Sequence, residues 1–169
     1  MAKSGSIHPA TARFSPNIVS PANACQFSCI PATRKRARGE AAGKEECWFI
    51  LEAELGSTLG IGTVRPLGAA KLRAAALSGA IEDLMESHAL TAAMFFHIPP
   101  GTVHAIGGGI SLIEIQQKSD VTYRLYGYGR PRELHLGDGT AVARAVPMLP
   151  SLQTAIPRQS TVLLSGACC

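Results

Sequence analysis

Short apolar runs separated by turn-forming residues dominate this chain, and the pattern predicts strands. Runs that are rich in β-branched and aromatic residues and bounded by Gly, Pro or Ser are typical of buried strands. Five such runs lie at residues 48–51, 58–64, 91–98, 110–116 and 122–126. Between the second and third runs, apolar residues from 69 to 85 recur every three or four positions, as on one face of an α-helix. Gly79 interrupts this stretch and predicts two short helices.

Many short strands with one helical insertion, near residues 69–88, predict an all-β fold, and a jelly-roll β-barrel suits the pattern best. The two ends of the chain lack the strand pattern. We therefore predict a poorly ordered basic extension over residues 1–39 and a folded domain over residues 40–146. Residues 147–169 would form a Pro-rich tail or a last strand, for which Val162 to Leu164 is the candidate.

Composition places the chain among soluble globular proteins. It has 169 residues, of which 46% are hydrophobic and 17% charged. This length predicts one domain with a sizeable core. No stretch is long and apolar enough to span a membrane, so no membrane partner is expected. Aromatic residues make up only 5% of the chain, which argues against a stacking surface for nucleic acid.

The net charge of +4 belongs to the N-terminal segment. Residues 1–39 carry six basic and no acidic residues, whereas the remaining chain has ten basic and twelve acidic residues, a net charge of −2. The basic run at residues 34–38 leaves two interpretations open, contact with an anionic partner or a solvated linker. We favour the linker, because no aromatic residue is interleaved with the charges.

Cysteine usage indicates a reducing compartment, and hence a cytoplasmic location. The five cysteines are Cys25, Cys29, Cys47, Cys168 and Cys169. An odd number of cysteines without a secretory leader favours free thiols. Cys25 and Cys29 have metal-ligand spacing, but no second close pair supports a zinc finger.

Two residues have the surroundings expected of a metal site. His104 follows the turn-forming sequence Pro99-Pro100-Gly101, where an imidazole can point inward at a ligand. Glu46 lies at the entry of the apolar run Trp48 to Leu51. A carboxylate buried there would need a cation to offset its desolvation. Taken alone, Glu46 would be read as an ordinary surface acid.

The residues around His104 resemble a known family. Residues 99–104, PPGTVH, resemble the second cupin motif, P-x-G-x-x-H. The strings GTVHAIG, EIQQKSDVTYRLYGYGR and PRELH, in this order, are similar to the C-terminal part of type I mannose-6-phosphate isomerases. GKEECWFIL at residues 43–51 resembles the G-K-x-E-C-W-Y-I-L segment of that family. The likeness runs from about residue 37 to residue 136.

This resemblance implies a cupin jelly-roll barrel that is incomplete at its N-terminus, with Zn²⁺ as the cofactor. Glu46 and His104 match metal ligands of the family. Residues 6–9, SIHP, faintly resemble the S-x-Q-x-H-P segment that supplies a Gln and a His to the metal. His8 is therefore a third candidate ligand. Ser6 stands where the family has the Gln ligand, so we favour the interpretation that His8 is a tail residue that binds no metal.

The resemblance also assigns catalytic and substrate-binding residues. Glu114 is an acid in an apolar strand, and it faces either solvent or the cavity. Arg124 either extends to solvent or turns inward to hold an anion or an enediolate oxygen, and the resemblance favours the second. Arg130 would meet the sugar phosphate, although a plain surface arginine is equally compatible with the sequence. His97 is expected to be a structural histidine pointing away from Phe96 and Ile98.

The implied activity is that of a zinc-dependent aldose-ketose isomerase interconverting mannose 6-phosphate and fructose 6-phosphate. Its partner would be a small-molecule sugar phosphate, and the sequence does not indicate an oligomeric state. The alternative is a catalytically impaired cupin remnant that acts as a sugar-binding or structural domain. This alternative stays open because catalytic zinc normally has three protein ligands, whereas only Glu46 and His104 are well supported by the sequence.

Overall fold

The computed structural model describes residues 14–20, 27–29, 44–117 and 122–156. In this part of the chain, ten strands and three α-helices follow one another with one 3-10 turn. In chain order they are β1 (Phe14–Val19), β2 (Phe27–Cys29), β3 (Glu46–Ala53), β4 (Thr58–Thr63), α1 (Ala69–Ser78), α2 (Ile81–Leu84), β5 (Met85–Ala89), β6 (Met94–Ile98), β7 (His104–Ile106), β8 (Ile110–Gln117), β9 (Tyr123–Tyr126), α3 (Leu136–Val142), η1 (Pro150–Leu152) and β10 (Gln153–Ala155).

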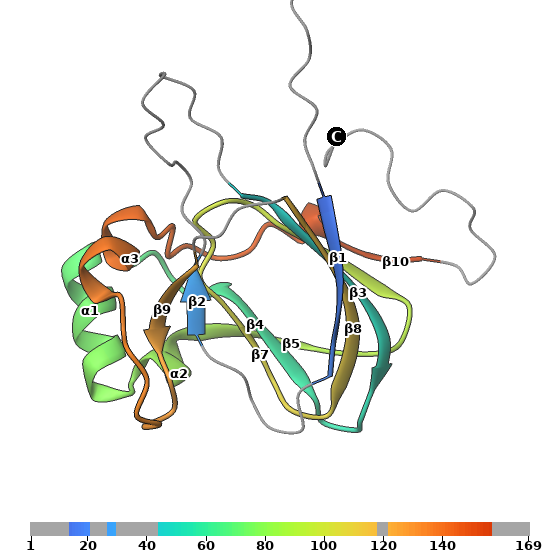
Figure 1. Cartoon of the computed structure of the whole chain (residues 1–169), viewed down its shortest axis with the longest axis horizontal. Helices are drawn as coiled ribbons and strands as arrows, with labels where there is room; N and C mark the ends of the chain where they lie inside the picture. Colours follow the sequence, from blue (N-terminus) through green and yellow to red (C-terminus); the bar gives the residue numbers. More distant parts are fainter. Residues whose placement is uncertain (1–13, 21–26, 30–43, 118–121, 157–169) are drawn as a thin grey trace, which may run out of the picture.

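The strands form two five-stranded sheets. Sheet A has the order β1-β8-β3-β6-β10, and sheet B has the order β5-β4-β7-β2-β9. The sheets face each other, and the helices lie beyond sheet B, so the molecule has three layers (Figure 1). The predicted all-β fold with a helical insertion is confirmed. Among the described strands, the two sheets share no member and do not close into one continuous barrel.

One hydrophobic core fills the space between the sheets. Alternation along each strand sends every second side chain into this space. Trp48 and Ile50 of β3, Leu59 and Ile61 of β4 and Leu112 of β8 are all fully buried there. Each large side chain buried in this way contributes roughly 1.5–3 kcal/mol relative to exposure. This core explains why the apolar runs of the sequence became strands.

A second core lies between sheet B and the helices. Leu72 and Ala76 of α1, Ile81 of α2 and Leu125 of β9 are buried in it. The predicted break at Gly79 is confirmed, because this glycine ends α1 with φ +82°. The helical insertion therefore covers the outer face of sheet B.

Helix α3 was not predicted, because its sequence LGDGTAV contains two glycines and reads as a turn. Gly139 explains the exception. A Cβ atom at this position would lie 2.7 Å from Leu125 Cδ2 and 3.1 Å from Tyr123 Cβ. Glycine thus lets α3 approach β9 more closely than another residue would allow.

The turn before His104 has the predicted form. The amide of Thr102 donates to the carbonyl of Pro99 at 3.2 Å. Gly101 has φ +82°, and a Cβ atom there would lie 2.9 Å from the carbonyl oxygen of Val142. Any other residue at this position would be strained and crowded, so the turn needs glycine.

Parts of both chain ends belong to the sheets. β1 and β2 lie within residues 1–39, where composition predicts a poorly ordered extension, and they pair with β8 and with β7 and β9. These strands of three to six residues are too short to change the average composition, yet they satisfy backbone groups along existing strands. β10 supplies a last strand earlier than expected, since Val162 to Leu164 lie outside the described residues.

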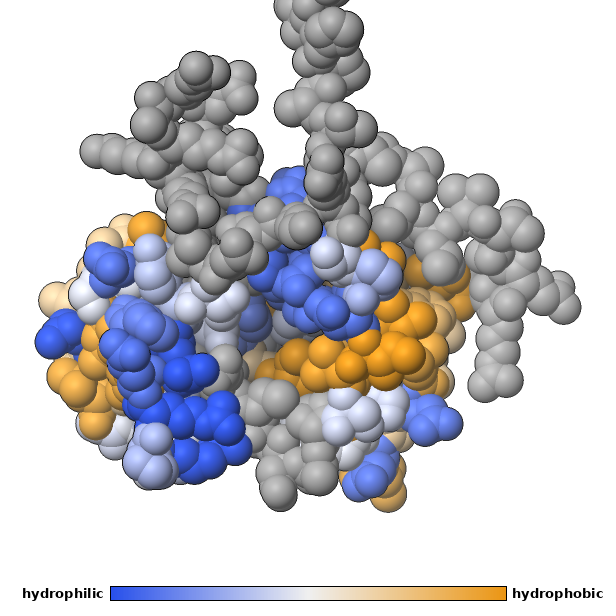
Figure 2. Space-filling view, in the orientation of Figure 1, coloured by the Kyte–Doolittle hydropathy of each residue, from blue (hydrophilic) through white to orange (hydrophobic). Residues whose placement is uncertain are grey.

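Sheet A leaves part of its outer face exposed. Ile18, Ile113, Phe49 and Phe95 stand opposite one another in neighbouring strands and so share the face that points away from sheet B. Figure 2 shows apolar surface on this side of the molecule, and Ile18 is 78% exposed. No helix in the described part of the chain has the length and apolar character needed to cross a membrane.

Candidate active site

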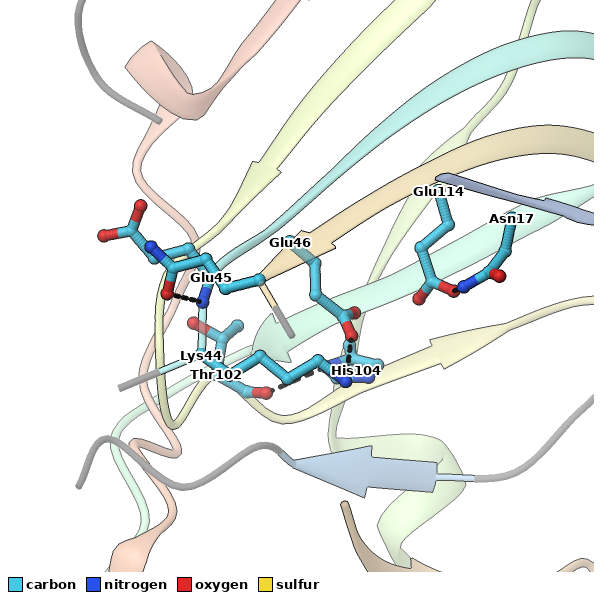
Figure 3. A network of polar contacts seen from close by, with 8 residues as sticks. Asn17, Lys44, Glu45, Glu46, Thr102, His104 and Glu114 are labelled. Atoms are coloured by element: carbon cyan, nitrogen blue, oxygen red, sulfur yellow. Dashed lines mark hydrogen bonds and ion pairs between the residues drawn. The ribbon is translucent and has the colours of Figure 1, made fainter. Parts of the chain in front are cut away.

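Glu46 and Glu114 point into the space between the sheets. Glu46 begins β3, and the alternation of this strand places it on the same face as Trp48 and Ile50. Glu114 of β8 lies directly opposite Trp48, and residues opposite each other in neighbouring strands share a face. Of the two orientations left open by the sequence, Glu114 has the inward one. Both carboxyl groups therefore border one polar end of the inter-sheet space (Figure 3).

His104 approaches the same end from sheet B. It begins β7 and is 6% exposed. Its ring contacts the Trp48 indole edge-on, with centroids 5.2 Å apart. Nδ1 lies 3.0 Å from the carbonyl oxygen of Thr102, which can only accept, so Nδ1 carries the proton. Nε2 is then left with a lone pair, which is the form that binds a metal ion.

Lys44 is a residue of this site that the sequence did not assign. Its Nζ lies 3.3 Å from Glu46 Oε1, and the two side chains are only 5% and 4% exposed. Figure 3 shows the lysine side chain reaching the carboxylate beside the imidazole of His104. The signal was present in the sequence, because residues two apart in an extended chain point to the same side.

Two buried polar atoms at this end lack a hydrogen-bond partner among the described residues. They are Oε2 of Glu46 and Nε1 of Trp48. An orphaned buried group of this kind costs about 1–3 kcal/mol. A cation on Oε2 would remove that cost for Glu46. The Trp48 indole and the Glu114 carboxyl group also lie near enough to Glu46 to oppose the rise of its pKa on burial, so the polar groups of this end gather around an oxygen that can accept a ligand.

Burial shifts the pKa of each titratable group in the cluster. Burial raises the pKa of Glu46, against the opposing effect of the Lys44 charge. Burial also raises the pKa of Glu114, and the neighbouring Glu46 carboxylate raises it further. Burial lowers the pKa of His104 to about 4. At neutral pH the imidazole is thus uncharged, and Glu114 keeps a proton more readily than an exposed carboxyl group.

The donors present suit a divalent metal ion, but they form only part of a site. A carboxylate and a neutral imidazole are ligands that zinc prefers. The described residues contain no group of three or more His, Cys, Asp or Glu side chains arranged to hold a metal. His8 lies outside the described residues. Glu46 and His104 therefore fit the expected metal as two of its ligands.

Arg124 lies on the face of sheet B that carries His104. Strand β2 lies between β7 and β9, and its Ser28 pairs with His104 on one side and with Arg124 on the other. Residues paired across neighbouring strands share a face, so both side chains lie on the inner face of sheet B. The Arg124 guanidinium donates to the carbonyl of Glu133 at 3.0 Å. Its backbone amide donates to Nδ1 of His135 at 3.1 Å. The residues after β9 thus hold Arg124 in place.

Arg130 lies in the loop after β9. Its Nε donates to the carbonyl of Gly127 at 3.1 Å, and its guanidinium lies 5.7 Å from the centroid of the Tyr128 ring. These contacts hold an exposed arginine on the loop, and its link with a phosphate group stays a prediction.

His97 faces away from the cluster, as expected for a structural residue. Its neighbours Phe96 and Ile98 are buried between the sheets, so His97 points to the opposite face of sheet A. There its Nε2 lies 3.7 Å from Glu45 Oε2. Glu45 and Glu46 thus lie on opposite faces, and only Glu46 belongs to the candidate site.

Comparison with known proteins identifies relatives of this chain. No family model matches it. Mannose-6-phosphate isomerase of Streptococcus mutans is 36% identical over 136 residues, which cover 73% of this chain and 42% of that protein. Mannose-6-phosphate isomerase ManA of Bacillus subtilis is 36% identical over 129 residues, which cover 73% of this chain and 40% of that protein. The chain thus spans about two fifths of the length of these relatives.

Solved structures with a similar fold come from the same kind of protein as these relatives. The crystal structure of the mannose 6-phosphate isomerase from Bacillus subtilis superposes with a TM-score of 0.70 at 28% identity, covering 80% of this chain and 45% of that chain. A mutant phosphomannose isomerase from Salmonella typhimurium, at 14% identity, shows the same fold with a TM-score of 0.61, covering 87% of this chain and 57% of that chain. The chain is therefore similar to mannose-6-phosphate isomerases in sequence over 73% of its length, and its fold matches that of their solved structures.

Proposed function

We propose that this chain is a zinc-dependent aldose-ketose isomerase that interconverts mannose 6-phosphate and fructose 6-phosphate. The observation that carries the proposal is the convergence of Glu46 from sheet A and His104 from sheet B at one polar end of the inter-sheet space. Relatives that bear the name of this activity are 36% identical to the chain.

Glu46 and His104 are the residues that would hold the zinc ion. Bound zinc would polarise the oxygens on the two carbons between which the proton moves. The hydrogen bond from His104 Nδ1 to Thr102 orients the ring and favours the tautomer that ligates through Nε2. The burial of both donors excludes water that would otherwise compete for the substrate oxygens.

Glu114 is the candidate for moving the proton. Isomerisation transfers a proton between adjacent carbons, so a group is needed that both accepts and returns it. Burial and the neighbouring Glu46 carboxylate raise the pKa of Glu114, so its carboxylate is a stronger base than an exposed one. Nδ2 of Asn17 donates to Glu114 Oε2 at 3.4 Å, which helps orient the carboxyl group.

Two arginines are candidates for binding negative charge. The enediolate formed between the two proton transfers carries negative charge on its oxygens. Arg124, on the same face as His104, would stabilise that charge. Arg130, on the loop after β9, would bind the phosphate group of the substrate, since a guanidinium group can donate two parallel hydrogen bonds to phosphate oxygens.

The second candidate is a cupin remnant that binds a sugar or serves a structural role without catalysis. It is favoured by the incomplete donor set, because Glu46 and His104 are two ligands and the described residues offer no group of three. In this case the polar end would remain folded around Lys44 and Glu46 without a metal.

An isomerase assay separates the two candidates. The full chain is loaded with zinc, freed of excess metal and assayed for conversion of mannose 6-phosphate to fructose 6-phosphate. We expect about one bound zinc per chain and activity that His104→Ala abolishes. The control His97→Ala, on the outer face of sheet A, should keep its activity. A folded chain without bound zinc and without activity would reject the isomerase and support the remnant.

A further inference from the structure

The burial of Lys44 needs an explanation of its own. A lysine is almost never fully buried unless its charge is paired. Lys44 is 6% exposed, lies just before β3, and extends its ammonium to 3.3 Å from Glu46 Oε1. The carboxylate that is proposed to bind zinc is therefore already neutralised by a group of the chain itself.

The backbone fixes the start of this side chain. The amide of Gln117 donates to the carbonyl of Glu45 at 3.1 Å, and Gln117 Oε1 accepts from the amide of Glu45 at 3.3 Å. These two bonds attach the entry of β3 to the end of β8. The flexible four-carbon side chain of Lys44 begins next to this anchored backbone.

Charge argues against zinc and Lys44 sharing Glu46. Glu46 and Glu114 together supply two negative charges when both are ionised, and an imidazole that binds metal through Nε2 is neutral and supplies none. A divalent cation matches the two carboxylates, and an added ammonium within a few ångströms would leave the buried cluster with excess positive charge. In surroundings of low polarity such excess charge is strongly unfavourable.

We propose that Lys44 is the counter-ion of Glu46 in the metal-free chain and that it leaves this carboxylate when a divalent cation binds. The ammonium keeps the cluster neutralised and folded before metal loading. Metal binding then exchanges one ion pair for another instead of filling an empty site. This inference rests on the metal site of the proposed function, but it concerns only the affinity for metal and the stability of the chain.

The exchange predicts opposite effects of one substitution on stability and on metal affinity. Lys44→Met removes the ammonium and keeps a side chain of similar length. Without metal, the variant should be less stable than the unchanged chain, because Glu46 loses its partner. With saturating zinc, the two should be equally stable. By linkage, Lys44→Met should bind zinc about tenfold more tightly, a change of the size that groups touching a metal ligand usually produce.

The test combines zinc titration by calorimetry with denaturant unfolding of the full chain, in chelator and in excess zinc. Lys71→Met, on the exposed side of α1, makes the same chemical change away from the site and should alter neither quantity. Cysteines can also bind zinc. The zinc that still binds to the Glu46→Gln variant is therefore subtracted, and only the binding that this substitution abolishes is assigned to the site. Weaker or unchanged zinc binding by Lys44→Met would overturn the exchange, and so would an equal loss of stability with and without zinc.

The isomerase assay is a separate measurement, so the two proposals fail separately. Exchange without activity would reject the isomerase and keep the exchange. If the unchanged chain is active but Lys44→Met binds zinc with the same affinity as the unchanged chain, the isomerase would be kept and the exchange rejected. Binding of zinc by neither the unchanged chain nor Lys44→Met would overturn the exchange and remove the metal from the proposed mechanism.

Discussion

The space between the two sheets has an apolar part and a polar end, and the same strands build both. In the apolar part, Ile50, Phe96 and Leu112 are fully buried and contact other apolar side chains. At the polar end, Lys44 and Glu46 are almost equally buried, yet Glu46 keeps an oxygen without a hydrogen-bond partner among the described residues. Burial is therefore similar in the two regions, while the chemistry of the buried groups is opposite.

This contrast separates stability from function. Apolar side chains gain free energy when they leave water, whereas charged groups lose hydration that the protein must replace. A buried ion pair is often no more stabilising than apolar residues of the same volume. Apolar residues in place of Lys44 and Glu46 would therefore stabilise the fold at least as well, so stability does not explain the polar end. Its presence is consistent with a site that binds something more strongly charged than its own residues.

The largest effect is expected in the apolar part. Phe96→Ala should lower the free energy of unfolding by about 3–5 kcal/mol, because Phe96 is fully buried and its loss leaves a cavity between the sheets. Urea unfolding of the unchanged chain and the variant measures this difference. A loss below about 1 kcal/mol would mean that this region is loosely packed and that the contrast is wrong.

At the polar end, one substitution should be more harmful than two. Glu46→Gln leaves the buried Lys44 ammonium unpaired and should lower the free energy of unfolding by about 3 kcal/mol in the absence of metal. The double variant with Lys44→Met should recover most of this loss, since no charge is left unpaired. Urea unfolding in chelator measures both. Equal losses for the single and double variants would show that the ion pair has no special role.

His104 should make metal-free stability sensitive to acid. Its pKa is lowered from 6.5 to about 4 in the folded chain, so between these values the unfolded chain binds a proton that the folded chain does not. Stability from this group is present above pH 6.5 and declines as the pH falls toward 4, by roughly 3 kcal/mol in total. Glu46 and Glu114 act in the opposite direction, because their raised pKa values make the folded chain bind more protons.

Comparison with His104→Gln isolates the histidine from these carboxyl groups. The stability difference between the unchanged chain and this variant should grow with pH across the window from 4 to 6.5. Unfolding in chelator at several pH values measures it. A difference that does not change with pH would mean that His104 is not buried in its neutral form.

The smallest effect is expected where an apolar residue lies outside both regions. Leu55 occupies the turn between β3 and β4 and is fully exposed. Leu55→Ser should change the free energy of unfolding by less than about 0.5 kcal/mol. Unfolding by urea, run beside Phe96→Ala, provides the comparison. A larger loss would place this turn in contact with residues outside the described part of the chain.

Much of the apolar part could be predicted from sequence. The run from Trp48 to Leu51 and the alternation around Phe96 follow from residue type and period, because burial of such side chains is what forms strands. The turn at Gly101 and the helix break at Gly79 follow from backbone geometry, which few other residues can adopt. These features depend on local chemistry, which a sequence displays directly.

Features that depend on distant contacts could not be predicted. Helix α3 exists because Gly139 fits against Leu125, and no local pattern reveals that contact. β1 forms because β8 offers it a partner, and its composition resembles that of the surrounding tail. The orientation of Glu114 follows from its register with Trp48. The burial of Lys44 could not be predicted, because a lysine beside a strand is usually exposed.

A crystal structure of the zinc-loaded chain, with anomalous diffraction at the zinc edge, tests the central claim most directly. That claim is that the polar end between the sheets exists to hold a divalent cation. We predict one strong anomalous peak at about 2.0–2.2 Å from the Glu46 carboxylate and from Nε2 of His104. Zinc found only on cysteines, with Lys44 still paired to Glu46, would contradict it.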